Sequence, residues 1–435
     1  MTDTRKLPHG GVNPPNDSNI SRTAPIANAL VPSRAVIPLL QHAGTPARCV
    51  VQQGDKVSEG MLIGKAEGAL SANVHSSIPG TVVAVTGITL PGGVASQAVV
   101  IDLEGEFGKS GKPRQPRAWE GASRIELLGR IQSAGVVGLG GSLMPTHLKL
   151  ASAPGSPVAL LVANGIDGEP GLSADFALLR EKTAEIAEAL RICRALLEPQ
   201  RIVLALGEDA RELAGAFEEA CATSKLACDI AILPSTYPQG HEQIVLGSIG
   251  VKGAPGRSVI LNVASLYAVY EAVVLDRPLI ERVVTVAGAP VARPRNLKVR
   301  LGTRLGDLFE ECGGLLAAPG KIVIGGPMRG VAVSSLDIPV TKGTSGVTVF
   351  DESAARTRTE WPCIRCGACV EVCPWDLFPT RLYKLVRQGS LAVADREGLS
   401  RCTECGCCAF ACPSHIPLVA VFHEGKKALA GGGNG

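Results

Sequence analysis

Aromatic side chains and net charge are both scarce in this sequence. Phe, Trp and Tyr make up 3% of the 435 residues, and the formal net charge is +3. Proteins that bind single-stranded nucleic acids stack bases on aromatic rings inside a positively charged groove, so we expect no nucleic-acid partner. Uninterrupted runs of about 18 apolar residues, which a membrane-spanning helix requires, are also missing. Any contact with a membrane should therefore be made through partner proteins.

The first 34 residues lack the apolar core of a secretory signal peptide. They are polar and interrupted by prolines, so we expect a cytoplasmic chain whose thiols stay reduced. Of the 14 cysteines, nine fall in two short runs near the C-terminus, and eight of these nine have ferredoxin-type spacing. Five others are scattered without ligand spacing, and we expect them to be reduced core residues: Cys49, Cys193, Cys221, Cys228 and Cys312.

The two cysteine runs carry the strongest chemical signal in the chain. One extends from Cys363 to Pro374 and the other from Cys402 to Pro413, and both have the spacing C-x2-C-x2-C-x3-C-P. This spacing is typical of bacterial ferredoxins with two [4Fe–4S] clusters, in which three cysteines bind one cluster and the fourth binds the other. We therefore predict an electron-transfer protein with these ligand sets: Cys363, Cys366, Cys369 and Cys412 for the first cluster, and Cys402, Cys405, Cys408 and Cys373 for the second.

Two other uses of the cysteines are weaker alternatives. A zinc ribbon needs only two C-x2-C pairs, so eight cysteines in two equal runs would be excessive. Disulfides would need an oxidising compartment, which no export signal indicates. Cys407 is an addition to the pattern, because the register selects Cys408, and we expect Cys407 to be a small buried residue.

Pattern changes along the chain predict a multidomain protein of α/β and β units. Residues 35–105 contain short β-type segments separated by Gly and Pro turns, in the order typical of the flattened barrel of biotinyl and lipoyl carriers. No Lys stands at the expected hairpin tip, where Leu70 to Asn73 occur, so this barrel should be structural. The expected units are an extended N-terminal arm over 1–34, the barrel over 35–105, an α/β domain over 120–280, a β-grasp module over 281–350, and a ferredoxin-type domain over 355–425.

Strands and helices should alternate in the α/β domain, which favours a largely parallel sheet. We expect strands over 158–163, 201–206, 229–233 and 258–263. Helices are expected over 123–133, from about 173 to 197, and over 210–222. The ferredoxin segment should contain a helix from Pro379 to Gln388, and the Gly-rich residues 431–435 should be disordered.

A glycine-rich loop from Gly138 to Lys149 is a candidate ligand site. Gly140 and Gly141 would let backbone amides approach a phosphate closely, and Lys149 could offset its charge. The loop does not match the dinucleotide-binding motif G-x-G-x-x-G, because that motif would need glycine at position 143, where the chain has Leu143. An ordinary turn therefore stays an equal alternative.

Polar loops follow several expected strands, at the edge where open parallel sheets bind ligands. Asn164 to Pro170 follow the strand that ends near residue 163, with a solvated turn as the alternative. The loop with Tyr237, Gly240 and Glu242 and the residue Asn262 occupy comparable positions after later strands. Several such loops at one edge indicate a site more strongly than any one of them.

These motifs together resemble the C subunit of the Rnf complex, a membrane-bound, ion-pumping ferredoxin:NAD oxidoreductase, and through it the flavin subunit of respiratory complex I. The likeness covers about residues 7–427, and it includes the glycine loop, both cysteine runs and the stretches at 10–15, 37–44, 164–175, 237–240, 278–282 and 325–328. It implies a barrel-sandwich hybrid domain, a Rossmann-like α/β flavin domain, a β-grasp module and an α-helical two-cluster ferredoxin domain.

The resemblance also implies noncovalent FMN, with NAD(H) as substrate stacked above it and two [4Fe–4S] clusters as electron carriers. FMN would be held by the loop with Gly138, Gly140 and Gly141, and by Lys149 and Asn164. Further pocket residues implied by the likeness are Asp167 and Glu169 beside flavin and nucleotide, Tyr237, Gly240 and Glu242 closing the pocket, and Asn262 near the FMN phosphate or ribityl chain. No side chain needs to act as acid or base, because FMN is the hydride partner.

Partners implied by the resemblance are membrane-embedded Rnf subunits and a ferredoxin-type subunit, with a peripheral location on the cytoplasmic face of the plasma membrane. The chain departs from the family where Ser142, Leu143 and Met144 replace Ala, Gly and Phe. Two alternatives therefore stay open: a flavin and iron–sulfur cobalamin reductase of a bacterial microcompartment, and a noncatalytic electron-wire subunit whose flavin loop has decayed.

Overall fold

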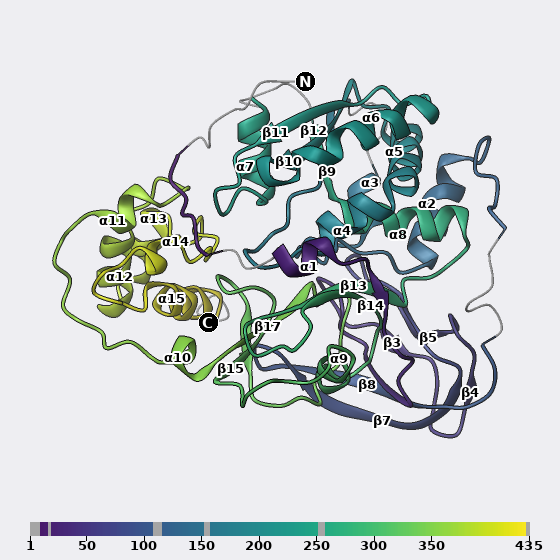
Figure 1. Cartoon of the computed structure of the whole chain (residues 1–435), viewed down its shortest axis with the longest axis horizontal. Helices are drawn as coiled ribbons and strands as arrows, with labels where there is room; N and C mark the ends of the chain where they lie inside the picture. The colour runs from purple at the N-terminus through teal and green to yellow at the C-terminus, as the bar shows by residue number, and fades with distance from the viewer. Residues whose placement is uncertain (1–8, 16–18, 108–114, 152–156, 251–256, 432–435) are drawn as a thin grey trace.

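The computed structural model describes residues 9–15, 19–107, 115–151, 157–250 and 257–431. Figure 1 shows the helices of the cysteine-rich segment at one end of the molecule, beside the α/β domain and the sheet that contains β15 and β17. The β-rich N-terminal domain lies at the other end. Residues 1–8 and 432–435, which belong to the predicted arm and the predicted disordered end, lie outside the described residues.

The N-terminal arm contains regular structure, so the expectation of an extended arm is wrong in its second half. A short helix, α1 (Asn19–Thr23), is followed by the strand β1 (Ala27–Asn28). β1 pairs in parallel with β14 (Arg295–Arg300), with Ala27 opposite Leu297. An edge strand leaves backbone N–H and C=O groups unpaired, and here a segment from far away in sequence pairs with them.

The N-terminal domain consists of two small sheets that enclose an apolar core. One sheet has the order β2 (Arg34–Pro38), β8 (Val94–Leu103), β7 (Gly80–Leu90) and β4 (Lys56–Val57). The other consists of β3 (Arg48–Cys49), β5 (Leu62–Lys65) and β6 (Val74–His75). Alternating side chains face inward, and Ile37, Ile63, Val99 and Ile101 are fully buried. The predicted all-β character is confirmed.

The α/β domain is built on a four-stranded parallel sheet, as the alternating pattern predicts. Its order is β11 (Asp229–Leu233), β10 (Arg201–Gly207), β9 (Val158–Asn164) and β12 (Arg257–Asn262). The strands are almost wholly apolar because helices cover both faces. These helices are α2 (Arg124–Ser133), α5 (Thr183–Leu197), α6 (Ala214–Thr223), α7 (Glu242–Ile249) and α8 (Val263–Val274).

The long helix expected from about residue 173 to 197 is two helices. α4 (Ala174–Glu181) ends at Lys182, whose φ of −128° lies outside the helical region, and α5 begins directly afterwards. The last turn of α4 binds the N-terminal arm, since Glu181 accepts a hydrogen bond from the Ile26 amide at 2.9 Å and Arg180 donates to the carbonyl of Ala24. The helix expected over 210–222 likewise begins as the 3-10 turn η1 (Glu208–Leu213).

The next module is a six-stranded mixed sheet with the order β1-β14-β13-β17-β15-β16. Its remaining strands are β13 (Glu281–Ala287), β15 (Lys321–Ile324), β16 (Val331–Val333) and β17 (Gly346–Phe350), and its helix is α9 (Leu305–Glu311). The strand, strand, helix, strand order agrees with the expected β-grasp unit. Leu305, Leu308 and Phe309 of α9 pack on the buried face of the sheet.

Buried charged side chains join these three domains. Arg300 of β14 contacts Glu59 of the barrel at 2.6 Å, and both side chains are less than a tenth exposed. Lys342, which is fully buried, donates to the carbonyls of Asn73 in the barrel and Gly135 in the α/β domain, at 2.7 Å each. Burial lowers the pKa of Lys342 to about 7. The domain junctions therefore depend on specific polar contacts.

Short helices form the cysteine-rich segment, and the helix predicted from Pro379 is confirmed. They are α10 (Glu352–Ala355), α11 (Ala368–Glu371), α12 (Pro379–Arg387), α13 (Leu391–Arg396), α14 (Cys407–Phe410) and α15 (Leu418–Gly431). Their core includes Leu382, Leu399 and Phe422. Within the described ranges, no helix combines the length and the apolar character needed to cross a membrane.

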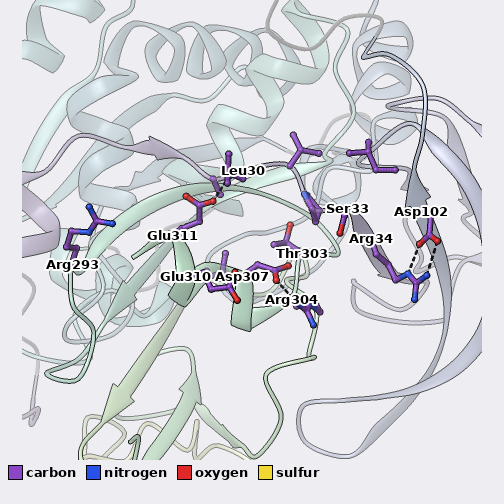
Figure 2. Close-up of a pocket in the computed structure, with 15 residues that line it drawn as sticks. Leu30, Ser33, Arg34, Asp102, Arg293, Thr303, Arg304, Asp307, Glu310 and Glu311 are labelled. Carbon is purple, nitrogen blue, oxygen red and sulfur yellow. Dashed lines mark hydrogen bonds and ion pairs between the residues drawn. The ribbon is translucent and has the colours of Figure 1, made fainter. Parts of the chain in front are cut away.

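A broad cavity of about 980 Å³ lies between the N-terminal domain and α9, away from the predicted site residues. Figure 2 shows its charged side chains, several of which pair with one another. Arg34 binds Asp102 through two hydrogen bonds of 2.5 and 2.8 Å, and Arg304 binds Asp307 at 2.8 Å. Because these four charges are already paired, and the predicted site residues lie elsewhere, the size of the cavity does not make it the candidate functional site.

Candidate functional site

The four cysteines predicted to bind the second cluster line one cavity. Cys373 comes from the first run, and Cys402, Cys405 and Cys408 come from the second; Cys407 lines the cavity as well. Burial, and after it the neighbouring thiols of the other three, raise the pKa of the Cys408 thiol. The remaining wall is mainly apolar, with Leu377, Leu382, Val419 and Phe422. This cradle of four thiols in a dry setting fits a [4Fe–4S] cluster.

The other predicted set is more open to solvent. Cys363 and Cys366 are exposed, Cys369 is buried, and Cys412 is partly buried. Burial raises the pKa of the Cys369 thiol, and the nearby thiols of Cys412 and Cys366 raise it further. The chain thus brings the last cysteine of the second run to the first set, as the spacing predicts. The ligand assignment itself stays a prediction.

Among the described residues, no group of three or more His, Cys, Asp or Glu is arranged to hold a single metal ion. A cubane cluster lies between its four cysteine ligands and keeps them farther apart than the ligands of a single ion. A cavity lined by four thiols is therefore the appropriate test of whether a cluster fits. All fourteen cysteines are free thiols, and Cys193, Cys221 and Cys312 are buried as expected. Cys49 and Cys228 are only partly buried.

Cys407 is fully buried and faces the α/β domain. Its thiol lies 3.9 Å from the carbonyl oxygen of Tyr237, to which it can donate a weak hydrogen bond. Val12, Tyr237, Cys405 and Cys407 form one small apolar cluster between the two domains. The expectation of a buried Cys407 is confirmed.

The glycine loop folds back on itself beside β12. The Gly138 amide donates to the Met144 carbonyl at 2.9 Å, and the Leu139 amide donates to the Ser265 hydroxyl at 2.8 Å. A Cβ atom on Gly140 would lie 2.8 Å from the Cβ of Asn262, so this close approach requires glycine. The loop and Asn262 are therefore neighbours, as the resemblance implies.

Three successive amides of this loop can receive an anion. Gly140, Gly141 and Ser142 are exposed, and within the described part of the chain their N–H groups have no hydrogen-bond acceptor. Gly141 has a φ of +106°, and a Cβ atom there would meet nothing within 4 Å. Consecutive free amides form an anion-binding concavity. This donor set fits the phosphate end of FMN.

Lys149 of α3 (Thr146–Leu150) is not an isolated cation. Its ammonium group contacts Glu242, the first residue of α7, at 2.7 Å. The Lys149 side chain is 16% exposed and that of Glu242 is 48% exposed. Both residues were predicted to lie at the pocket, and their pairing with each other was not predicted. Lys149 therefore offers less net charge to a phosphate than we expected.

The predicted strand-end residues do meet at the carboxyl edge of the parallel sheet. Asn164 on β9 lies opposite Asn262 on β12 in the strand register. The Asn164 amide donates to the Gly240 carbonyl at 2.9 Å, and a Cβ atom on Gly240 would lie 3.1 Å from the Asp167 carbonyl. Alignment of parallel strands brings these loops together, as the sequence predicts.

Asp175 also belongs to this site, although no role there was predicted for it. Asp175 accepts a hydrogen bond from the Asn262 side chain at 2.7 Å, and its own amide donates to Asp167 at 3.0 Å. Burial, followed by the neighbouring Asp175 carboxylate, raises the pKa of Asp167. Burial also raises the pKa of Asp175, while Asn262 and Arg282 oppose that rise. The stretch 164–175 in the family resemblance was the signal for Asp175.

Glu169 and Tyr237 connect the α/β domain to the other modules. The Glu169 carboxylate accepts hydrogen bonds from the Met328 amide at 2.9 Å and from Arg329 Nε at 3.1 Å. The Tyr237 hydroxyl donates to the Cys405 carbonyl at 2.7 Å and lies 3.5 Å from Glu169. The site thus extends from the edge of the sheet to the second cysteine set. Glu169 and Tyr237 were predicted site residues, and Arg329 was not.

A cavity of about 110 Å³ covers the carboxyl ends of β9, β10 and β11. Its lining includes Asp167, Glu169, Tyr237 and Gly240, together with Asn13 of the N-terminal arm. Ligand pockets usually measure about 300–1,000 Å³, so this space is small for a whole flavin. The arm was not predicted to contribute to the site, because its contacts join segments far apart in sequence.

Four family descriptions match successive parts of the chain. "RnfC Barrel sandwich hybrid domain" matches residues 7–106, and "Nuo51 FMN-binding domain" matches residues 131–271. "SLBB domain" matches residues 283–332, and "4Fe-4S dicluster domain" matches residues 362–416. Together they agree with the multidomain fold class that the sequence predicts.

Relatives that match most of the chain agree with these family descriptions. The chain is 35% identical to the C subunit of the proton-translocating ferredoxin:NAD(+) oxidoreductase complex of Clostridium ljungdahlii, over 86% of this chain and 83% of that protein. It is 34% identical to the C subunit of the ion-translocating oxidoreductase complex of Rhodobacter capsulatus, over 97% and 83%. It is 31% identical to the Na(+)-translocating counterpart of Acetobacterium woodii, over 86% of each.

A solved structure supports the fold. A chain of an NAD+-reducing [NiFe]-hydrogenase in the H2-reduced state matches with a TM-score of 0.50 and 19% identity. The match covers 72% of this chain and 63% of the hydrogenase chain. At 19% identity this match supports the fold alone, and the activity has to be argued from the site.

Proposed function

Because this chain belongs to the family of the C subunits of ion-translocating ferredoxin:NAD(+) oxidoreductase complexes, we propose that it handles NAD(H) for such a complex. Electrons pass between NAD(H), FMN and two [4Fe–4S] clusters, and onward to or from partner subunits. The FMN-binding and dicluster domains support these cofactors. The relatives support this function over a microcompartment cobalamin reductase.

One contact carries the proposal beyond the family likeness. The Tyr237 hydroxyl, at the edge of the flavin domain, donates to the carbonyl of Cys405, a predicted ligand of the second cluster. The edge that would bind flavin and the loop that would bind a cluster are therefore joined by one side chain. Such continuity supports electron transfer between two cofactors more directly than the presence of both domains does.

The chain's own residues bind and orient, because hydride transfer is the chemistry that bound FMN supplies. The amides of Gly140, Gly141 and Ser142 would hold the phosphate end, as consecutive free amides do. Asn262, oriented by its hydrogen bond to Asp175, would border the same end. Asn164, held by the Gly240 carbonyl, would border the ring side. Together they would fix the flavin at the carboxyl edge of the sheet.

Reconstituted protein tests this function. We expect FMN near one per chain and bleaching of the cluster absorption by NADH under anaerobic conditions. The chain with Cys408→Ser should still show flavin reduction by NADH, because its flavin domain is intact. Cluster-containing protein that binds no FMN under reconstitution would contradict the proposal and support an electron-wire subunit.

We further infer membrane-embedded and ferredoxin-type partners and a peripheral position at the cytoplasmic face of the membrane. The relatives are subunits of complexes, and no described helix can span a bilayer. The chain should sediment with membranes when its partner subunits are co-expressed and stay in the supernatant without them. Membrane retention without partners would contradict this and would indicate an anchor in the chain itself.

The departure at 142–144 should weaken nicotinamide binding more than FMN binding. Leu143 has a φ of +51°, where glycine is favoured, and its side chain packs near Gly343. Because the Leu143 side chain packs near Gly343, we expect the gain in NADH affinity from the triple change Ser142→Ala, Leu143→Gly, Met144→Phe to come from the aromatic ring at 144. An aromatic contact is worth about 0.5–1.5 kcal/mol beyond its area, or roughly threefold to tenfold in affinity.

NADH titration of the reconstituted protein measures this change. The single variant Leu143→Gly is the matched control, and it should leave the NADH dissociation constant unchanged. If the triple variant alters neither FMN nor NADH binding, the loop does not contact the nucleotide.

A further inference from the structure

The loop between β15 and β16 binds the flavin-side carboxylate Glu169. Glu169 receives hydrogen bonds from the Met328 amide and from Arg329 Nε, and its side chain is 8% exposed. A Cβ atom on Gly326 would lie 2.3 Å from the Glu169 Cβ, so only glycine permits this fit. Burial raises the pKa of Glu169, and the Met328 amide and the Arg329 guanidinium limit that rise. Arg329 is therefore held in one position by a buried acceptor.

The same loop touches the second cysteine set. A Cβ atom on Gly406, the residue after Cys405, would lie 3.0 Å from the Met328 carbonyl oxygen. Met328 also packs against the apolar cluster that contains Cys405 and Cys407. From the other side, the Tyr237 hydroxyl reaches the Cys405 carbonyl at 2.7 Å and lies 3.5 Å from the carboxylate that binds Arg329. A fixed arginine thus stands beside one of the two cluster-binding loops.

Other charges near the second set are paired with one another. Lys426 donates to the Cys402 carbonyl and also pairs with Glu404 at 2.9 Å, and His423 lies 3.0 Å from the same carboxylate. Asp376 faces His9 at 3.3 Å and is largely exposed. Arg329 is paired as well, with Glu169 at 3.1 Å, but its partner belongs to the flavin domain, whereas Lys426 pairs with a carboxylate of the cysteine-rich segment itself.

The first set has a different environment. Cys363 and Cys366 are exposed, and residues 361–366 are exposed throughout. Arg365 lies in this loop and is exposed, and among the described residues it forms no ion pair, whereas the Arg329 side chain is 37% exposed and is held by the buried carboxylate of Glu169. The two predicted clusters are therefore in unequal electrostatic surroundings.

We propose that Arg329 raises the reduction potential of the cluster bound by Cys373, Cys402, Cys405 and Cys408 relative to that of the other cluster. This rests on the proposed function, since it requires both clusters to be present. Net charge, hydrogen bonding and solvent exposure set the potential of an iron–sulfur cluster, and reduction adds one negative charge, which a nearby cation stabilises. The offset favours electron transfer from the exposed first cluster to the second, toward the flavin pocket.

Redox titration of the reconstituted chain, followed by electron paramagnetic resonance, tests this inference. Arg329→Met removes the charge and keeps the length of the side chain. At a fixed solution potential near the midpoint, the reduced-to-oxidised ratio of the second cluster should fall about tenfold, which corresponds to about 59 mV for one electron. The first cluster should not change. Cys408→Ser and Cys363→Ser identify which signal belongs to which cluster.

Three further variants sharpen the test. Arg329→Lys keeps the charge and should leave the potential near that of the unmodified chain. Glu169→Gln removes a negative charge from the same site and should shift the second cluster in the opposite direction, which keeps the test valid if Arg329→Met assembles poorly. Arg304→Met removes an arginine far from both cysteine sets, at the barrel-side cavity, and should change neither cluster.

Several results would overturn the inference. They are an unchanged second cluster in both Arg329→Met and Glu169→Gln, an equal shift of both clusters, and a shift of the first cluster alone. Failure of the proposed function is a separate result, because the unmodified chain would then show no signals from two reducible clusters.

Discussion

Replacing Cys408 by Ser should remove or convert one of two iron–sulfur clusters. The unmodified chain, purified anaerobically or reconstituted, should carry about eight iron and eight sulfide, as two cubane clusters require. Cys408 lines the same cavity as Cys373, Cys402 and Cys405, so its loss leaves one cluster with three thiolates. Iron should fall to about four per chain, or to about seven if a three-iron cluster forms. Iron and sulfide analysis with electron paramagnetic resonance measures the outcome.

Cys407→Ser is the matched control. Cys407 is adjacent in sequence, is also buried and lines the same cavity, but the C-x2-C-x2-C-x3-C spacing assigns the ligand position to Cys408, and the Cys407 thiol lies 3.9 Å from the Tyr237 carbonyl oxygen. The variant should therefore keep the iron content of the unmodified chain. Equal losses in both variants would show that the ligand register is wrong. Stoichiometric zinc with iron near zero would reject the iron–sulfur assignment itself.

Replacing Arg300 by Met should destabilise the junction between the barrel and the β-grasp module. The Arg300 guanidinium contacts Glu59 at 2.6 Å and Glu281 at 3.4 Å, and it donates to the Ser77 carbonyl at 3.1 Å. The three charged side chains are each less than a tenth exposed. Removing one partner of a buried ion pair costs about 3–5 kcal/mol, because it leaves an uncompensated buried charge. Scanning calorimetry should show a lower midpoint for the transition that includes both domains.

Two further variants identify the cause of that loss. Adding Glu59→Gln to Arg300→Met removes the unpaired charge and should recover part of the midpoint. Arg34→Met breaks a pair with Asp102 in which both side chains are well exposed, so it should change the midpoint little. If Arg34→Met and Arg300→Met lower the midpoint equally, burial of the ion pair is not what stabilises the junction.

Local patterns were sufficient for much of this fold. The strand expected over 229–233 is β11, and the strand expected over 201–206 is β10 with one more residue. Alternation of such strands with helices also predicted the parallel sheet, and with it the meeting of Asn164 and Asn262 at one edge. In each case the signal lies within a few residues, because strand burial and periodicity are local properties.

Boundaries that depend on distant contacts were not predictable. The break at Lys182 carries no proline or glycine, and the end of α4 is bound by residues of the N-terminal arm. The strand β1 is two residues long and exists through pairing with β14, which belongs to a module much later in the chain. Neither feature leaves a periodic signal in its own segment.

In the candidate site, too, some features were predictable from local sequence and others were not. Cysteine spacing by itself predicts two cubane clusters and the cysteine of each run that crosses to the other set, because three of the four ligands of each cluster lie a few residues apart and the fourth position follows from the C-x2-C-x2-C-x3-C-P pattern. Only the tertiary structure showed that Lys149 pairs with Glu242, that Asp175 orients Asn262, and that Arg329 binds Glu169 while its neighbour Met328 contacts the Cys405 loop. Lys149 and Glu242, like Asp175 and Asn262, come from distant segments of the α/β domain, and Arg329 and Glu169 come from separate domains. Their electrostatic interactions depend on distance in space, which domain packing decides and no local sequence pattern records.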